Sequence, residues 1–479
     1  MRIEVPYVLL NKNYMPMKYL FSAFIVILFL SLSQKKDSRY LGIQPWGENP
    51  RYWEYKGKPI LLLGATDNDN LFQNDNLKSH LDSLRMFGGN YIRNTMSDRD
   101  PGNKRAFAET ASGKYDLDKW NPDYWQRFEN LLRLARERDI IVQIEIWDRF
   151  DHSRDPWLDD PFNPKNNINY TYTEASLDSL YPLHPGQNKQ PFFFTVPELQ
   201  NNKVLLKYQE NFVKKILSIS LKYDNVLYCI DNETSGAEEW AAYWAGFLRK
   251  NSGGKKIFVT EMWDDWDVKS ARHKRTLDYP ERYDFIDISQ NSQIPGQPNW
   301  DNTQYVFDYI KDNPRPVNST KIYGSDRGSW LDRGITTKHA VETFCRNIVG
   351  GFAASRFHRP PSGLGLSNTS INCLKTIRKI EEKVKFWDMI PRMDLVGNAG
   401  ENKAYVTAKE GDSYVIYFTQ PGMVTLDLTS AKGPFSIEWI SVEKAEWAKK
   451  DVSSGGKTVE IISEYSGDAF AVLKRIKEF

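Results

Sequence analysis

The sequence contains little cysteine and little histidine. Its three Cys residues, Cys229, Cys345 and Cys373, form no C-x-x-C pair, so neither a cysteine zinc site nor a disulfide framework is expected. The 6 His residues include no His-x-His pair on the first predicted strand. This shortage disfavours a metal-dependent hydrolase, the alternative that such a pair would indicate. We therefore expect neither a metal nor another cofactor.

The sequence also lacks an excess of either charge. It has 64 Lys and Arg against 62 Asp and Glu, and the basic residues are spread along the chain, so no nucleic-acid partner is expected. Aromatic residues make up 14% of the chain, with 15 Trp. Exposed aromatic faces stack on the C–H surfaces of sugars, although a large aromatic core explains any single Trp equally well. With 479 residues, the chain is long enough for a barrel-sized domain and a smaller one.

An apolar run stands near the N-terminus, in "MKYLFSAFIVILFLSLSQKK", which begins at Met17. One Lys precedes about a dozen apolar residues, and small and polar residues follow, a pattern typical of a secretory signal peptide. The run is short for a transmembrane helix, which needs about 20 apolar residues. We expect residues 1–36 to be a signal peptide or N-terminal extension. The mature protein is then exported to the periplasm or beyond the cell without a membrane span, and an uncleaved membrane anchor is the alternative.

Eight short apolar segments follow residue 58 and alternate with helical patterns. Such runs, bounded by polar residues, are typical of strands covered on both faces. The predicted strands are 59–67, 88–96, 139–148, 225–233, 255–264, 283–291, 320–326 and 350–358. The predicted helices are 121–139, 203–224, 236–251 and 336–351. The alternation predicts an α/β fold, a (β/α)8 TIM barrel over residues 40–393. A doubly wound open sheet is the alternative, disfavoured because no G-x-G-x-x-G turn follows the first strand.

Three further segments have patterns of their own. Residues 40–58 predict a lead-in hairpin that turns at Lys56 and Gly57. Residues 149–199 are rich in Pro, Asn and Tyr with little periodicity, and a loop of this length is usually functional or flexible. Because it follows the third strand, it belongs on the catalytic rim. Residues 394–479 alternate apolar and polar residues between Gly and Pro turns, which predicts a small antiparallel β-sandwich.

Polar and ionisable residues end every predicted strand. The active site of a (β/α)8 barrel lies at these carboxyl ends, and a barrel built only for stability does not need such residues there. We expect substrate binding by Asp67, Asp69, Arg93, Trp147, Asp148, Asn232, Trp263, Asn291, His358 and Arg359. One or two tryptophans near the rim are expected to form the base of a sugar subsite; the candidates are Trp147, Trp263, Trp266 and Trp330. The structural alternatives are helix capping for Asp67, Asp69 and Asp264 and a buried ion pair for Arg93.

Glu233 is the strongest catalytic candidate, because the sequence "NETSG" already offers Thr234 and Ser235 as helix caps. Cleavage of a glycosidic bond needs two carboxyl groups, one on each side of it. Strands four and seven lie opposite each other in an eight-stranded barrel, so Asp326 is the predicted second carboxylate. Glu261 on strand five is the alternative second carboxylate. Carboxyl groups about 5–5.5 Å apart retain the anomeric configuration, and groups about 6.5–9.5 Å apart invert it.

The residues at the strand ends resemble those of a known group of enzymes. The Asn232-Glu233 pair at the end of strand four resembles the acid/base signature of the large clan of retaining (β/α)8 glycoside hydrolases. The resemblance implies that Glu233 is the general acid/base, that Asn232 contacts a substrate 2-hydroxyl, and that Arg93 supports the nucleophile. The opening "NPRYWEYKGKPILLLG" is similar to the first-strand entry of bacterial members. The C-terminal sandwich resembles a domain of such proteins that is named for collagen binding.

One departure from the clan pattern affects the predicted mechanism. The clan has a Glu nucleophile at the end of strand seven, whereas this sequence has "YGSDRG" with the shorter Asp326. We therefore expect an exported glycoside hydrolase acting on a plant or algal poly- or oligosaccharide, with retention favoured and inversion open. The alternative is a non-catalytic carbohydrate-binding barrel protein. The sequence does not predict the oligomeric state.

Overall fold

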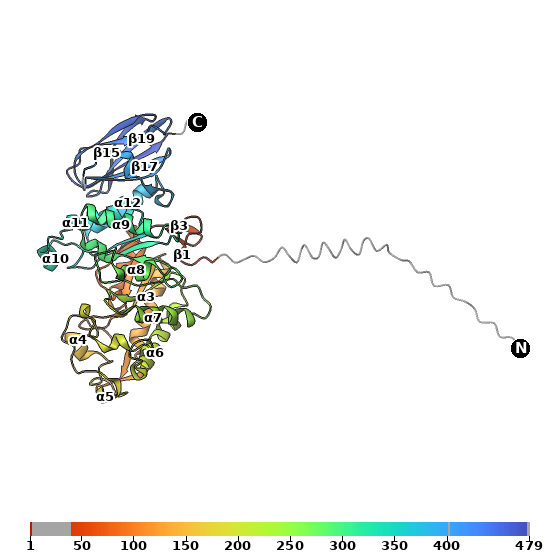
Figure 1. Ribbon diagram of the computed structural model, residues 1–479, viewed down its shortest axis with the longest axis vertical. Helices are drawn as coiled ribbons and strands as arrows, with labels where there is room; N and C mark the ends of the chain where they lie inside the picture. Colours follow the sequence, from red (N-terminus) through yellow and green to blue (C-terminus); the bar gives the residue numbers. More distant parts are fainter. Residues whose placement is uncertain (2–39, 401–402, 477–479) are drawn as a thin grey trace. The chain divides into compact units, whose positions relative to one another are not determined.

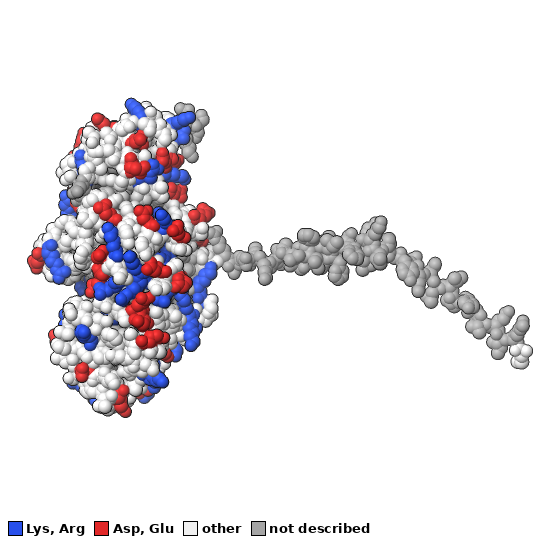
Figure 2. Space-filling view, viewed as in Figure 1, with Lys and Arg blue, Asp and Glu red and all other residues white. Residues whose placement is uncertain are grey.

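A computed structural model describes Met1, residues 40–400 and residues 403–476 of the chain. Apart from Met1, the predicted signal peptide over residues 1–36 lies outside the described residues. From Gly42 onward the chain forms one compact unit. Among the helices of the described ranges, none is long and apolar enough to cross a membrane. Lys and Arg side chains are interspersed with Asp and Glu side chains on the face in view (Figure 2).

Eight parallel strands form the central sheet, in the order β10-β9-β8-β5-β4-β13-β12-β11. They are β4 (Leu62–Ala65), β5 (Tyr91–Thr95), β8 (Ile141–Asp148), β9 (Val226–Asn232), β10 (Val259–Thr260), β11 (Ile286–Asp287), β12 (Val317–Ile322) and β13 (Ala354–Phe357). A parallel bridge between Met262 and Asp287 joins the two ends of this order, so the sheet closes into a barrel. The predicted (β/α)8 barrel is confirmed: seven of the eight predicted segments contain one of these strands in full, and the segment over 320–326 overlaps β12 in part.

The seventh strand, β12, begins earlier than the sequence predicts. The prediction over 320–326 rests on apolar character, whereas β12 spans Val317–Ile322 and contains the polar stretch Asn318–Lys321. These polar side chains are buried because the barrel interior supplies partners for them. Thr320 Oγ1, for example, donates to Asp287 Oδ2 at 2.9 Å. A polar strand interior cannot be recognised from hydrophobicity alone.

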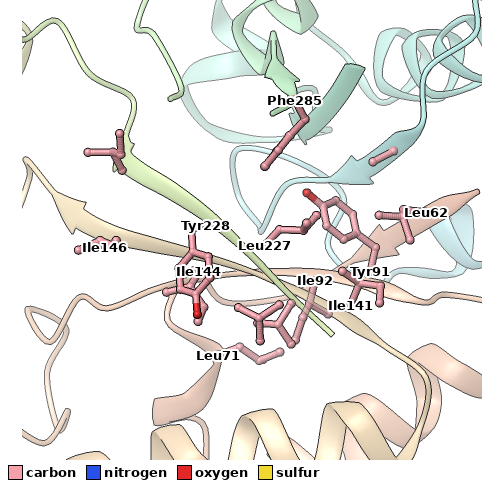
Figure 3. Close-up of a cluster of buried hydrophobic side chains, with 14 of the residues drawn as sticks. Leu62, Leu71, Tyr91, Ile92, Ile141, Ile144, Ile146, Leu227, Tyr228 and Phe285 are labelled. Carbon is pink, nitrogen blue, oxygen red and sulfur yellow. The ribbon is translucent and has the colours of Figure 1, made fainter. Parts of the chain in front are cut away.

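A chain of hydrogen bonds crosses the barrel interior. Tyr91 OH on β5 donates to Gln143 Oε1 on β8 at 2.6 Å. Gln143 Nε2 in turn donates to Asp287 Oδ2 on β11 at 3.2 Å, and Asp287 also accepts the bond from Thr320 on β12. Four strands that are not all neighbours are therefore joined by directional bonds. Apolar residues fill other positions of the core, where Leu62, Ile92, Ile141, Ile144 and Leu227 pack together (Figure 3).

Helices surround the strands, and the four predicted helices begin within two residues of their predicted starts. The helices around the strands are α2 (Leu77–Met86), α3 (Pro122–Glu137), α6 (Lys203–Ser220), α7 (Glu238–Lys250), α8 (Ala271–Leu277), α9 (Gln297–Tyr309), α10 (Gly328–Asp332), α11 (Thr337–Val349) and α12 (Asn368–Glu381). Local chemistry explains the starts. Asn121 accepts a bond from Asp123 N and Pro122 is the first residue of α3, and Thr336 forms a capping box with His339 before α11.

The lead-in hairpin closes the N-terminal end of the barrel. Strands β1 (Gln44–Pro45), β2 (Trp53–Tyr55) and β3 (Lys58–Ile60) pair antiparallel, and the turn residues Lys56 and Gly57 have φ of 52° and 76°. Trp53 Nε1 donates to Asn318 Oδ1 at 3.1 Å, and its ring meets Phe285 edge-on, with centroids 5.2 Å apart. Both partners lie at the amino ends of barrel strands, so the hairpin lies on the side of the barrel opposite the strand carboxyl ends.

The insertion over 149–199 carries short helices on an aromatic layer. It contains α4 (Arg154–Asp159), α5 (Tyr172–Ala175), η2 (Pro185–Gln187) and η3 (Pro191–Phe194), and a small hairpin, β6 (Phe107–Glu109) with β7 (Tyr115–Trp120), precedes it. Trp157, Phe192 and Phe193 are fully buried. His152 stacks on Phe192 with ring centroids 3.7 Å apart. This packing fixes the insertion beside the ends of β8 and β9.

The C-terminal region forms two antiparallel sheets. One contains β14 (Ile390–Pro391), β16 (Ala404–Lys409), β17 (Ser413–Phe418), β22 (Ala469–Arg475), β19 (Pro434–Ser441) and β20 (Glu446–Ser454). The other contains β15 (Val396–Gly397), β18 (Gly422–Asp427) and β21 (Thr458–Ser463). These sheets share their own core, confirming the predicted sandwich, and they lie beside α11 and α12 (Figure 1). The ring centroid of Trp300 on α9 lies 4.7 Å from that of Tyr405 on β16. The domain boundary at 393/394 stays a prediction.

Candidate active site

Arg93 is the centre of a polar network at the carboxyl ends of the strands. Its guanidinium, fully buried on β5, donates from Nε to Glu145 Oε1 at 2.5 Å and from Nη2 to Asn232 Oδ1 at 2.8 Å, and Nη1 pairs with Asp69. Burial of an unpaired guanidinium is costly, and here each of its three nitrogens has an acceptor. The structure thus brings together three of the predicted residues, Arg93, Asp69 and Asn232, in one ion-pair network.

Asp69 and Asp148 extend this network on either side. Asp69 also pairs with Arg359 through Oδ2 at 2.5 Å, and His358 Nδ1 lies 3.6 Å from Oδ1. Burial opposes ionisation of Asp69, but the charges of Arg93 and Arg359 hold its pKa well below the ordinary value. Asp148 Oδ2 accepts from Asn232 Nδ2 at 2.9 Å and from Arg99 at 2.6 Å. Asn232 is therefore held on both ends of its amide.

Glu233 stands next to this network in an unusual backbone conformation. It follows the last residue of β9 with φ of 48°, a left-handed conformation that costs energy for a residue with a Cβ. Three donors converge on its Oε1: Lys321 Nζ at 2.7 Å, Gln290 Nε2 at 2.9 Å, and Tyr323 OH. In the described chain Oε2 has no hydrogen-bond partner, and 16% of the side chain is exposed. One carboxylate oxygen is fixed and the other is free to react.

The surroundings of Glu233 decide its charge. Burial by itself raises the pKa of this carboxyl, but the charge of Lys321 and the hydrogen bonds from Lys321 and Tyr323 outweigh it and lower the pKa from 4.5 to about 2. The Lys321 ammonium also donates to Asn232 Oδ1. Glu233 is therefore an anion at neutral pH, and one lysine holds both members of the Asn-Glu pair.

Tyr323 is itself positioned by aromatic contacts. Its ring stacks on Trp330 with centroids 4.1 Å apart, and the ring of His358 meets it edge-on at 5.2 Å. The Arg333 guanidinium lies 4.9 Å from the centroid of Trp330. Because Tyr323 and Arg333 both contact the Trp330 ring, that ring positions the tyrosine rather than offering a bare sugar platform.

The other predicted tryptophans differ in exposure. Trp147 and Trp263 are buried: Trp147 packs against Phe192, Phe212 and Trp244, and the Trp263 indole donates to Thr276. Neither ring is open to a sugar, because each supports the packing between strand and helix. Trp266 is 56% exposed and is the only one of the four with a largely open ring.

Two other predicted residues, Asp67 and Asn291, lie outside the network. Asp67 is half-exposed; its Oδ1 accepts from Leu366 N at 2.8 Å, so it ties β4 to the loop after β13. Asn291 is buried and exchanges side-chain and backbone hydrogen bonds with Asn299 at the start of α9. Asp67 thus has a structural contact, and Asn291 positions a helix.

The two predicted second carboxylates are placed differently. Asp326 is exposed, and together with Asp67, Ser325, Arg327 and Leu366 it lines a surface depression of about 530 Å³. Glu261 is fully buried, and its Oε1 accepts from Asp231 N at 3.0 Å and Met262 N at 2.9 Å. Burial and the Asp231 charge raise the pKa of Glu261 well above its ordinary value. The structure joins neither residue to Glu233, and their catalytic roles stay predictions.

Sequence reasoning does not single out Lys321 and Tyr323, although both bind Glu233. The signal for Lys321 is a lysine inside a strand, in "VNSTKI", where only a buried acidic partner justifies such a residue. That partner comes from a different strand, so its identity depends on the closed barrel.

No family model matches the sequence, and no curated protein matches it. Solved structures match in fold. A glycoside hydrolase of family 5 from Bacteroides vulgatus gives a TM-score of 0.63 at 15% identity, over 91% of this chain and 93% of that chain. A structure described as a glycoside hydrolase gives 0.62 at 13% identity, over 91% and 97%. An α-amylase from Geobacillus thermoleovorans gives 0.55 at 13% identity, over 87% and 98%. Identities this low show that the chain shares their fold, and no more.

Proposed function

We propose that this protein is a glycoside hydrolase that cleaves O-glycosidic bonds of an extracellular poly- or oligosaccharide, with Glu233 as its reacting carboxylate. The observation that carries the proposal is the state of Glu233. It stands at the carboxyl end of a barrel strand, where such folds hold their active sites, in a strained backbone conformation. It is ionised, fixed through Oε1 and free at Oε2. The descriptions of the fold neighbours as glycoside hydrolases support the same reaction.

The charge of Glu233 favours a role other than the one implied by the resemblance. A general acid must carry a proton near neutral pH, and a carboxyl with a pKa of about 2 does not. We propose that Glu233 is the nucleophile. Its Oε2 attacks the anomeric carbon while the bond from that carbon to the leaving oxygen breaks, and water then hydrolyses the resulting ester. Two displacements at one carbon retain the anomeric configuration.

The buried network gives Glu233 a fixed position. Arg93, Asn232 and Asp148 are almost fully buried, so their role in the proposal is to hold the β9 end in place rather than to reach far into substrate. Arg359 has a side chain that is 34% exposed while its Nε pairs with Asp69, and it is the network member best placed to bind a sugar hydroxyl. Positioning of this kind accounts for much of enzymatic rate enhancement.

A non-catalytic carbohydrate-binding barrel is the second candidate. The exposed position of Asp326, apart from the contacts of Glu233, favours it, because a barrel without a second carboxyl would bind a glycan but not cleave it. This candidate predicts saturable binding with no release of reducing ends after long incubation.

The test uses 4-nitrophenyl β-glycosides of glucose, mannose, galactose and xylose together with plant and algal polysaccharides. We expect hydrolysis of at least one substrate and a loss of at least about 10³-fold in kcat/KM for Glu233→Gln. The matched control is Glu137→Gln, an exposed glutamate on α3, which should keep wild-type activity. Full activity in Glu233→Gln would contradict the proposal. NMR of the first product tests retention.

Export is also a proposal, supported by the pattern around Met17 in the sequence. Expression of the full chain with fractionation of the cells, followed by N-terminal sequencing of the exported form, tests it. A protein found only in the cytoplasm with its N-terminus intact would contradict it.

A further inference from the structure

Asp264 lies at the end of the strand next to Glu233. A parallel bridge pairs Thr234 with Trp263, and Asp264 N donates to Thr234 O at 2.7 Å, so the chain after β10 runs beside the chain after β9. Trp263 is fully buried, with its indole bonded to Thr276 on α8. The chain bends at Asp264, and the Asp264 carboxylate lies against the loop around Gly186.

The Asp264 carboxylate is half-buried and has no hydrogen-bond or ion-pair partner in the described ranges of the chain. The loop before η2 lies against it, since a Cβ on Gly186 would be 3.5 Å from Asp264 Oδ2. The same loop reaches the Glu233 strand end, where Ser235 Oγ donates to Pro185 O at 3.4 Å. A free carboxylate thus lies against the same loop that contacts Ser235, two residues after Glu233.

We propose that Asp264 is the proton donor that works with Glu233, an inference that rests on the proposed function. In the first step the Asp264 O–H proton goes to the leaving oxygen, which departs as an alcohol while Glu233 Oε2 bonds to the anomeric carbon. In the second step the Asp264 carboxylate takes a proton from water. The resulting hydroxyl bonds to the anomeric carbon, the Glu233 ester breaks, and Asp264 is again protonated. The sum is glycoside plus water giving sugar plus alcohol.

The charges around Asp264 support this division of labour. Burial and the negative charge of Glu233 raise the pKa of Asp264 from 3.8 to about 6, with Asp265 adding to the effect and Lys321 and Arg272 opposing it. His184, on the same loop as Gly186, is also influenced by the Glu233 charge and is held neutral because its pKa is lowered by burial and by Arg154. Two neighbouring carboxyls with pKa values pushed apart are typical of an acid and a nucleophile.

The alternatives for the proton donor fit less well. Glu261 has no exposed surface, and its Oε1 accepts hydrogen bonds from two backbone amides, so it cannot reach a leaving oxygen in this structure. Asp326 is exposed and lines a different depression, with Asp67. Asp264 is the carboxyl that combines partial burial, an open acceptor and the influence of the Glu233 charge.

The experiment compares Asp264→Asn and Asp326→Asn with Asp267→Asn as the matched control on the same loop. We expect Asp264→Asn to lose about 10²–10⁴-fold in kcat/KM on an oligosaccharide, whose leaving group needs a proton. On a 2,4-dinitrophenyl glycoside, Asp264→Asn should lose less than about 10-fold in the rate of the first step, because that leaving group departs as an anion and needs no proton. The fall in kcat/KM that wild type shows above about pH 6 should disappear, and azide should speed turnover of Asp264→Ala, since an anion needs no base.

The outcomes separate the two proposals. If Asp264→Asn and Asp264→Ala melt like wild type and keep its leaving-group dependence and pH profile, the assignment of Asp264 is overturned while the glycosidase proposal stands. If Asp326→Asn shows the expected pattern instead, the donor is Asp326. If the wild type hydrolyses no substrate of the panel, the proposed function and this inference fall together.

Discussion

The ammonium nitrogen of Lys321 lies 2.7 Å from Oε1 of Glu233 and donates as well to the amide oxygen of Asn232. A single cation on β12 therefore holds two consecutive residues at the end of β9. Only 2% of the Lys321 side chain is exposed, so solvent screens this interaction little. Lys321 is thus expected to set both the charge and the position of Glu233.

Replacement of Lys321 by Met should raise the pKa of Glu233, because the largest interaction favouring its anion is removed. Glu233 must be ionised to act as nucleophile, so kcat/KM should begin to fall at a higher pH in the variant. We expect wild-type kcat/KM to be flat down to about pH 4 and the variant to lose activity between about pH 6 and 4. Lys338→Met, an exposed lysine on α11, is the control. An acid limb that stays at the same pH in Lys321→Met contradicts the role given to Lys321.

Glu233 should make the stability of the protein depend on pH in a defined direction. Its folded pKa of about 2 lies below the ordinary value of 4.5, so its ionisation stabilises the fold above pH 4.5, and this contribution is lost as the pH falls toward 2. The difference corresponds to about 3 kcal/mol. Urea unfolding of wild type and Glu233→Gln should therefore differ most near pH 7, and the gap should shrink below about pH 4.5. A gap that is constant between pH 7 and 3.5 rules out the depressed pKa.

Arg93→Met should destabilise the fold strongly. The change leaves Glu145 and Asp69 without their buried cation, and removal of one partner from a buried ion pair costs about 3–5 kcal/mol. Arg133→Met removes an exposed pair with Glu137 on α3 and should change the free energy of unfolding by less than about 1 kcal/mol. Urea titration at pH 7 measures both. Similar values for the two variants contradict the central position of Arg93.

Trp266 and Trp263 should behave in opposite ways when each is replaced by Ala. Trp266 is 56% exposed, so its loss should leave stability within about 0.5 kcal/mol while raising KM for an oligosaccharide several-fold, because a stacking surface is removed. Trp263 is fully buried against α8, so its loss should cost about 3–5 kcal/mol of stability. Thermal melting and steady-state kinetics separate the two effects. An unchanged KM in Trp266→Ala would show that this ring is not part of a subsite.

The predictable part of this fold is the part that depends on local patterns. Apolar spacing and caps such as Asn121 and Thr336 locate the helices, and turn residues such as Gly57 locate the hairpin. The start of β12 is missed because its buried residues are polar, which no hydrophobic pattern reports.

The candidate site divides in the same way. Arg93, Asp69, Asp148 and Asn232 are found because strand ends can be read from the sequence, and their mutual contacts follow from the barrel. Lys321, Tyr323 and the free state of Asp264 are not found, since each depends on a partner from another strand. The exposure of a tryptophan also cannot be predicted from the sequence. Trp263 and Trp266 have similar sequence surroundings, yet Trp263 packs on α8 and Trp266 faces solvent.

The hydrogen-bonded chain from Tyr91 through Gln143 and Asp287 to Thr320 has a consequence for how the barrel assembles. Apolar contacts are not directional, so a strand shifted in register by two residues would still place apolar side chains in the interior. These four side chains are not interchangeable, and each one left without its partner would cost about 1–3 kcal/mol. These hydrogen bonds therefore favour the native strand register over shifted registers. A barrel whose strands are shifted by two residues is destabilised by the polar side chains that lose their partners.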